Sequence, residues 1–281
     1  TGLVDTFAGV VTPRNLTVTI GVTGTTNAVK FDSDVGNVSR LGAISVSGAK
    51  ALTASDTGFL KAGSLTATVA GPISIKGPQD YNAASGLSLT ANGTQVTAGD
   101  SDINVGNITT STGGVVTFSN KYGLNLLGDI SSAGVITQTA VGGGTPLVTI
   151  GNSLSAVGVT IATTTGTLIN FASNIVMQKN VTFQTILSGS ITLGTIGGTL
   201  LSDTNNTGTL SLNVISTGTG SINLNSNIGS VAGQVLGLLN VSTGGQTNIA
   251  SSVITTSGSS GQTFTGNVDY TLDLVMTAGN G

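Results

Sequence analysis

Ile215-Ser-Thr-Gly-Thr-Gly-Ser-Ile-Asn-Leu-Asn225 runs from small turn-forming residues into a short stretch in which apolar and polar side chains alternate. An alternation with a period of two places the apolar side chains on one face, as in a half-buried β-strand. The same design recurs in Leu187-Ser-Gly-Ser-Ile-Thr-Leu-Gly194 and in Gly151-Asn-Ser-Leu-Ser-Ala-Val-Gly-Val-Thr-Ile-Ala162. The sequence therefore predicts short strands separated by tight turns.

Stretches of this kind occur along the whole chain. They combine Val, Ile and Leu with Thr, Ser or Asn, and the β-branched residues among them favour extended backbone over helix. No stretch of helical length carries apolar residues at positions i, i+3, i+4 and i+7, which one face of a helix requires. We therefore expect almost no helix, and strands near residues 16–20, 43–47, 65–69, 85–90, 115–118, 147–151, 180–183 and 209–214.

Composition decides between two all-β architectures. Glycine accounts for 43 of the 281 residues and aromatic residues for only 4%. A β-sandwich core usually contains bulky aromatic side chains, whereas a solenoid stacks like residues from coil to coil and turns its corners with small residues. We therefore expect a β-solenoid with about 20 to 25 residues per coil, and tandem β-sandwich domains are the alternative.

The residue types that are missing exclude most side-chain chemistry. His, Cys and Trp do not occur, every acidic residue is Asp, and 8 basic residues stand against 11 acidic ones. Imidazole acid–base catalysis, thiol nucleophiles, and His or Cys metal sites are therefore impossible. Between Asp129 and Asp269 the only charged residues are Lys179 and Asp203. We expect a protein that is not an enzyme, with no catalytic residues and no cofactor.

The N-terminal half contains the charged residues that could form a site. Asp32 with Asp34, and Asp100 with Asp102, place two carboxylates on one face of a strand, where they could offer oxygens to Ca²⁺. Two carboxylates are far fewer than the six to eight ligands that Ca²⁺ takes, so we expect no metal site. Arg40 together with Asp32 and Asp34 is the one combination that could serve a carbohydrate-active β-helix enzyme, the third functional hypothesis.

Repeated hydroxyl pairs suggest one kind of surface. A ladder of Thr-x-Thr pairs is how solenoid ice-binding proteins present hydroxyl groups, but the spacing of these pairs along the sequence is irregular. We therefore expect ordinary strand alternation and no single ladder. Nucleic-acid binding is not expected either, because the eight basic residues are scattered. The Thr-x-Thr pairs considered are Thr17/Thr19, Thr66/Thr68 and Thr163/Thr165.

The two ends of the sequence suggest assembly. Residues 1–40 differ in composition from residues 41–281, and we expect them to be an N-terminal cap or an assembly arm on the solenoid. Residues 270–281 are largely apolar and do not resemble a polar cap. An arm could pair with the next subunit by adding a strand to its sheet. The residues expected to take part are Leu16, Thr17, Val18, Thr19, Ile20, Leu272, Leu274, Val275 and Met276.

Two phrases of the sequence resemble a known family. These are Ile254-Thr-Thr-Ser-Gly-Ser-Ser-Gly-Gln-Thr-Phe-Thr-Gly-Asn-Val268 and Asp129-Ile-Ser-Ser-Ala-Gly-Val-Ile-Thr-Gln-Thr139. They are similar to recurring segments of large bacterial exoproteins of the filamentous haemagglutinin type, with Phe264 where Tyr is commoner. The resemblance implies a right-handed parallel β-helix displayed at, or released from, a bacterial surface, and it carries over no catalytic residues.

These observations favour a non-catalytic structural or adhesive β-solenoid, located outside the cell or on its surface. Its expected partners are further copies of itself, through end-to-end assembly or a longer polypeptide, and glycans or proteins on host or neighbouring cells. The alternative is a subunit of a filament or surface layer that is completed by strand donation between chains. Membrane insertion is not expected, because no apolar run approaches the roughly 20 residues that a membrane helix needs.

Overall fold

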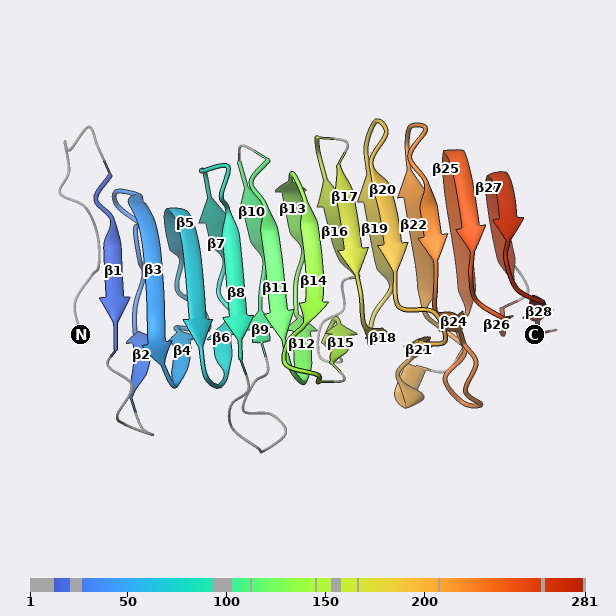
Figure 1. Cartoon of the computed structure of the whole chain (residues 1–281), viewed down its shortest axis with the longest axis horizontal. Coiled ribbons are helices and arrows are strands. Elements are labelled where there is room, and N and C mark those ends of the chain that lie inside the picture. Colours follow the sequence, from blue (N-terminus) through green and yellow to red (C-terminus); the bar gives the residue numbers. More distant parts are fainter. Residues whose placement is uncertain are drawn as a thin grey trace. The chain divides into compact units, whose positions relative to one another are not determined.

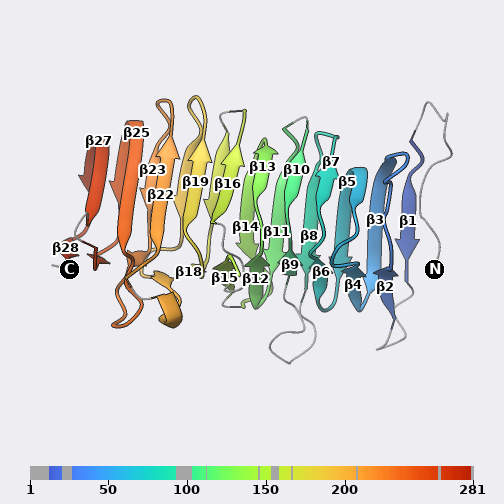
Figure 2. The same cartoon turned by 180° about the vertical axis from the view of Figure 1, so that it is seen from behind.

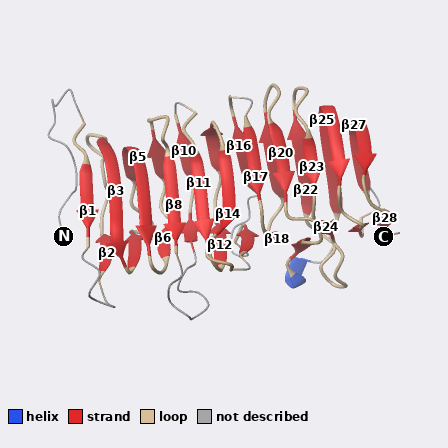
Figure 3. Cartoon of the chain, in the orientation of Figure 1, coloured by secondary structure: helices blue, strands red, loops and turns tan. Residues whose placement is uncertain are grey.

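The computed structural model describes residues 13–20, 27–92, 103–111, 113–144, 146–152, 158–165, 167–206, 208–258 and 261–279. Its regular structure is almost entirely strand, and the only helix among these residues is the single turn η1 (Thr204–Asn206) (Figure 3). The expected all-β chain with almost no helix is therefore confirmed. The chain forms two compact units, Thr1–Pro146 and Leu147–Gly281.

The strands of the N-terminal unit form three parallel stacks (Figure 1). Two long strands, β3 (Leu41–Ala49) and β5 (Leu60–Val69), contribute their first parts to the first stack and their second parts to the second stack. The first stack continues with β7 (Gln79–Tyr81), β10 (Ile108–Thr110) and β13 (Ile130–Ala133). The second stack also contains β1 (Leu16–Thr19), β8 (Leu87–Ala91), β11 (Val116–Asn120) and β14 (Ile136–Ala140). The third stack consists of β2 (Ala28–Phe31), β4 (Ala51–Ala54), β6 (Ile73–Ile75), β9 (Ile103–Val105) and β12 (Gly123–Leu126).

The C-terminal unit has three parallel stacks of its own (Figure 2). Here β25 (Leu238–Ile249) and β27 (Gln262–Tyr270) are the long strands that contribute to two stacks. The first stack also contains β16 (Val159–Thr163), β19 (Val181–Thr185) and β22 (Ser211–Ser216), and the second contains β17 (Leu168–Phe171), β20 (Ser190–Leu193) and β23 (Ile222–Leu224). The third consists of β15 (Leu147–Ile150), β18 (Asn174–Met177), β21 (Thr199–Ser202), β24 (Asn227–Ile228), β26 (Val253–Thr256) and β28 (Val275–Ala278).

In both units the chain visits the three stacks in turn. β10, β11 and β12, for example, follow one another in sequence and lie in the first, second and third stack. Each circuit is one coil, and neighbouring coils pair through parallel strands. This arrangement is a parallel β-helix, so the predicted solenoid is confirmed and tandem β-sandwiches describe neither unit.

Paired residues of successive coils are separated by very different lengths of chain. Val116 pairs with Ile136, twenty residues later, whereas Ile191 pairs with Ile222, thirty-one residues later. The longer coil includes the corner that carries η1. The expected coil of about 20 to 25 residues holds for the shorter circuits, and the extra residues of the longer ones lie in the corners.

Apolar side chains that point inward fill each coil. Leu193 is almost completely buried and pairs in register with Phe171 in one neighbouring coil and Leu224 in the other. Ile161 is fully buried and pairs with Phe183. The rings of Phe171 and Phe183 meet edge to face, with centroids 5.5 Å apart. The strand alternation of the sequence thus builds a continuous aliphatic and aromatic core within the unit.

The core of the N-terminal unit also contains a hydrogen-bonded polar chain. The Tyr81 hydroxyl donates to Oε1 of Gln79 at 3.0 Å, and Nε2 of Gln79 donates to the carbonyl of Ile75 at 3.0 Å. Both side chains are buried. Burial raises the pKa of the Tyr81 phenol well above its ordinary value, and the neighbouring carboxylate of Asp80 raises it further. The phenol is therefore held in its neutral form.

Candidate functional surfaces

The acidic pair Asp32 and Asp34 is engaged by its own chain. Oδ1 of Asp34 accepts the backbone N–H of Phe59 at 2.8 Å, and Oδ2 accepts Nδ2 of Asn37 at 2.8 Å. Asp32 forms an ion pair with Lys30. These contacts stabilise a corner between coils. The second pair, Asp100 and Asp102, lies outside the described residues.

Arg40 forms an ion pair with Asp80 and not with Asp32 or Asp34. Its guanidinium pairs with Oδ2 of Asp80 and donates to the carbonyls of Asp80, at 2.6 Å, and Ala62, at 3.0 Å. The combination of Arg40 with Asp32 and Asp34 is therefore not assembled, because Arg40 bridges to two later coils instead. Within the described part of the chain, no three acidic residues gather closely enough to hold a metal ion.

The N-terminal residues expected to mediate assembly form a strand of the second stack. β1 pairs in register with Ile44–Ser47 of β3, and the N–H of Ile20 donates to the carbonyl of Ser47 at 3.0 Å. Leu16, Val18 and Ile20 are half-buried, while Thr17 and Thr19 are exposed. β1 and β2 thus belong to the same stacks as β3 and β4, which follow residue 40, and no described residue pairs with the other edge of β1.

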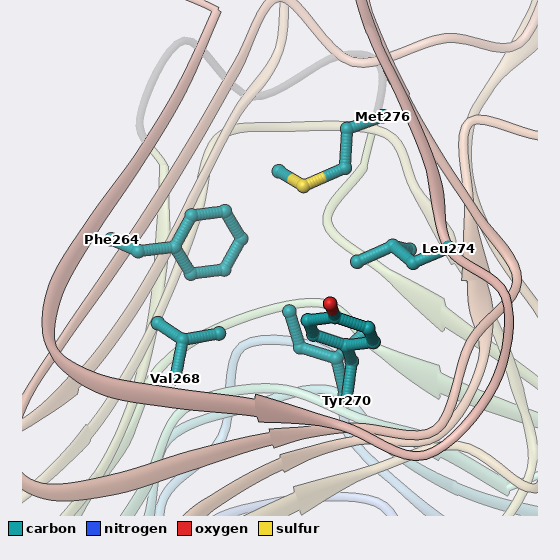
Figure 4. Close-up of a pocket in the computed structure, with 6 residues that line it drawn as sticks. Phe264, Val268, Tyr270, Leu274 and Met276 are labelled. Atoms are coloured by element: carbon teal, nitrogen blue, oxygen red, sulfur yellow. The ribbon is translucent and has the colours of Figure 1, made fainter.

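At the C-terminal coil the interior of the β-helix is open. A hollow of about 410 Å³ lies between β27 and β28, and the side chains in Figure 4 point into it from both strands and the turn between them. The second edge of β27 has no partner strand among the described residues. The hollow is lined by Ile249, Phe264, Val268, Tyr270, Leu274 and Met276.

The C-terminal residues predicted to take part in assembly lie in this hollow or beside it. Leu274 is half-buried and, with Met276, lines it, whereas Leu272 and Val275 are exposed apolar side chains that do not. The exposed fraction reaches 64% for Tyr270, although its partner in the preceding coil, Ile249, is buried. Side chains that occupy interior positions of the coil are thus left uncovered on one side.

The second stack of the N-terminal unit carries a surface that the sequence did not reveal, which we call the hydroxyl array. In each of six coils, two outward positions on one strand are Thr or Ser, and parallel pairing aligns them into two columns. The strands lie side by side in Figure 1 as β1, β3, β5, β8, β11 and β14. One column is Thr17, Ser45, Thr66, Ser88, Thr117 and Thr137, and the other is Thr19, Ser47, Thr68, Thr90, Ser119 and Thr139.

The expectation that Thr-x-Thr pairs form no single ladder is therefore wrong for this unit. The spacing is irregular only because the corners differ in length, while the strands remain in register. Thr17/Thr19 and Thr66/Thr68 both belong to the array. Thr163 does not, because it lies in the other unit and its side chain is buried.

The outward face of the C-terminal unit carries amide ladders beside hydroxyl residues such as Thr182 and Thr192. Nδ2 of Asn248 donates to Oδ1 of Asn223 at 2.8 Å, and Nδ2 of Asn240 donates to Oδ1 of Asn213 at 3.3 Å. The apolar–Asn–apolar strands of the sequence are the signal that could have located these ladders. They link neighbouring coils without charge.

Comparison of the chain with protein-family models, with curated proteins and with solved structures found no match. Among the described residues, no helix has the length and apolar character needed to cross a membrane.

Proposed function

We propose that this chain is a non-catalytic structural or adhesive β-solenoid of a cell surface or extracellular fibre. The observation that carries the proposal is the use of polar side chains to join one coil to the next. Asp34 accepts a backbone N–H from Phe59, and Arg40 bridges to Asp80 and Ala62. Asp34 and Arg40, two charged groups that could otherwise bind a substrate, are thus engaged in holding the scaffold together.

The composition and the resemblance to filamentous haemagglutinin-type exoproteins support the same proposal. On the outward face of the C-terminal unit, neutral Thr, Ser and Asn side chains offer many hydrogen-bonding groups to glycans or proteins on another surface. The proposed role is therefore to hold these faces away from the cell, or to build a fibre from them.

Antibody labelling of intact cells of the source organism tests the location. We expect an antibody raised against this chain to label unpermeabilised cells or their medium. Labelling that requires permeabilisation would contradict the proposal. Assay of the purified chain on polygalacturonate tests the enzyme alternative, and turnover there would replace the structural role with a catalytic one.

A second candidate function, self-assembly, is favoured by the open hollow at β27 and β28. The partner that fits is the β1 strand of a second copy, because β1 belongs to the second stack and its other edge pairs with no described residue. Pairing of inward positions would place Leu16 over Val268 and Val18 over Tyr270.

Val268→Glu tests this assembly, because it places a carboxylate where Leu16 would pack. We expect the full chain to form ordered fibres in negative-stain images and Val268→Glu to remain as single particles. Ile196→Glu is the matched control, since Ile196 is an exposed apolar residue of the same unit at 72% exposure, outside the hollow. Ordered fibres from Val268→Glu would exclude this interface.

A further inference from the structure

We propose that the hydroxyl array of the N-terminal unit binds the surface of ice. The inference concerns this face alone and does not depend on the proposed structural role. The array presents twelve hydroxyl side chains, two on each of six strands, and none of them is buried. A ligand that matches it must itself present hydrogen-bonding atoms in a regular two-dimensional lattice.

The spacing of the array follows from sheet geometry. Neighbouring strands lie about 4.8 Å apart, and alternate residues of one strand lie about 6.6 Å apart, so the backbone positions that carry the hydroxyls form a lattice of roughly these dimensions. Some neighbouring hydroxyls hydrogen-bond to each other, and their oxygens then lie closer, as at 3.4 Å between Thr137 and Thr117. Six strands extend it over about 24 Å in the stacking direction. Oxygen atoms on the faces of ice recur at comparable spacings, so many array positions can meet lattice waters at once.

Contacts within the array and below it keep this lattice ordered. The Ser47 hydroxyl donates to that of Thr19 at 3.4 Å, and the hydroxyls of Ser119 and Thr139 lie 3.2 Å apart. The residue between the two hydroxyl positions of each strand is buried in the core, except Val18, which is half-buried. These contacts and the packed core beneath the strands limit the rotamers that the array side chains can adopt. Binding therefore loses less side-chain entropy.

The chemistry of the face favours ice over a polysaccharide. The six strand segments contain no charged residue, and their one aromatic side chain, Phe118, points into the core. Sugar rings would find no aromatic surface on which to stack, and a hydroxyl that exchanges water for a sugar gains little net free energy. Binding to ice does not require a hydroxyl to exchange its bound water for another partner. The water molecules that hydrogen-bond to the hydroxyls become part of the ice itself.

Substitution at the centre of the array tests the proposal. Thr68 is exposed and lies between Ser47 and Thr90, so Thr68→Tyr would raise a ring above the lattice and hold ice away. The matched control is Thr109→Tyr, because Thr109 is an exposed strand threonine of the same unit in the first stack. The full chain and both variants are compared by incorporation into a growing ice hemisphere and by inhibition of ice recrystallisation.

We expect the full chain and Thr109→Tyr to enter the ice and slow recrystallisation, and Thr68→Tyr to lose most of both effects. Melting curves check that each variant is folded, and Thr90→Tyr replaces Thr68→Tyr if the latter is not. Exclusion of the full chain from ice would overturn the proposal, and so would equal loss in the Thr68 and Thr109 variants. Sedimentation with cellulose or chitin that Thr68→Tyr abolishes, without entry into ice, would assign the face to a polysaccharide instead.

Discussion

Oδ1 of Asn107 lies 2.9 Å from the backbone nitrogen of Asp129, one coil further along the chain, and accepts its hydrogen bond. The residue before Asp129 is Gly128, and a Cβ atom there would lie only 2.2 Å from the same oxygen. The asparagine amide thus occupies the space that a side chain at residue 128 would fill. The same relationship joins Asn15 to Gly42 and Ala43, and Asn174 to Gly198 and Thr199.

This contact predicts an interaction between two substitutions. Asn107→Ala leaves the Asp129 N–H without its acceptor and should lower the free energy of unfolding by about 1 to 2 kcal/mol. Gly128→Ala should also destabilise, because its Cβ clashes with Asn107. In the Asn107→Ala background, however, Gly128→Ala should cost less than it does alone. Urea unfolding of the single and double variants measures this, and strictly additive effects would contradict the contact.

Truncation of the core should be costly in the C-terminal unit. Leu193 is packed in register between Phe171 and Leu224, so Leu193→Ala leaves a cavity and should lower the free energy of unfolding by about 2 to 5 kcal/mol. Thr192→Ala, at the adjacent half-buried position, is the control and should cost much less. A melting temperature of Leu193→Ala within a degree or two of that of the parent would contradict the register.

Stability should fall at high pH because of Tyr81. The folded state holds a phenol whose pKa is raised, whereas the same phenol in the unfolded chain ionises near its ordinary pKa of about 10. The contribution of Tyr81 to the free energy of unfolding is therefore complete below about pH 10, where the phenol of the unfolded chain is still neutral. It is lost as the pH rises from there toward the raised pKa of the folded state. Unfolding in urea between about pH 8 and pH 11 measures the slope, which should persist in Tyr270→Phe and weaken in Tyr81→Phe.

Removal of divalent metal ions should leave the melting temperature unchanged. Both oxygens of Asp34 accept hydrogen bonds and Oδ1 of Asp32 pairs with Lys30, and two carboxylates are far fewer than the six to eight ligands that Ca²⁺ takes. Differential scanning fluorimetry with and without EDTA measures the effect. A large decrease would contradict the expectation, and Asp100 and Asp102 would then be the first ligands to substitute.

The sequence predicted the strands and their inward faces well, because alternation is a local property. Ile161 and Leu193 are apolar positions of the alternating stretches 151–162 and 187–194, and both are buried. Parallel stacking was also predictable from composition, since Gly, Asn and Thr replace the aromatic residues of a sandwich. These features depend on a few consecutive residues and need no knowledge of which coils are neighbours.

The hydroxyl array and the partner of Arg40 depend on distances between coils, and the sequence does not display these. Thr19 and Ser47 are twenty-eight residues apart, whereas Ser119 and Thr139 are twenty apart, yet both pairs are neighbours in the sheet. A constant sequence period would have revealed the columns. Corners of variable length remove that period while the backbone hydrogen bonds keep the strands aligned.

The corner that carries η1 has a consequence for protein engineering. It lengthens one coil to thirty-one residues, and yet Ile191 and Ile222 remain paired on either side of it. Foreign peptides could therefore be grafted at this corner without disturbing the sheets, since the strands and not the connecting chain determine the alignment. The fold would then serve as a display scaffold in which the peptide inserted at this corner varies and the stacked strands stay the same.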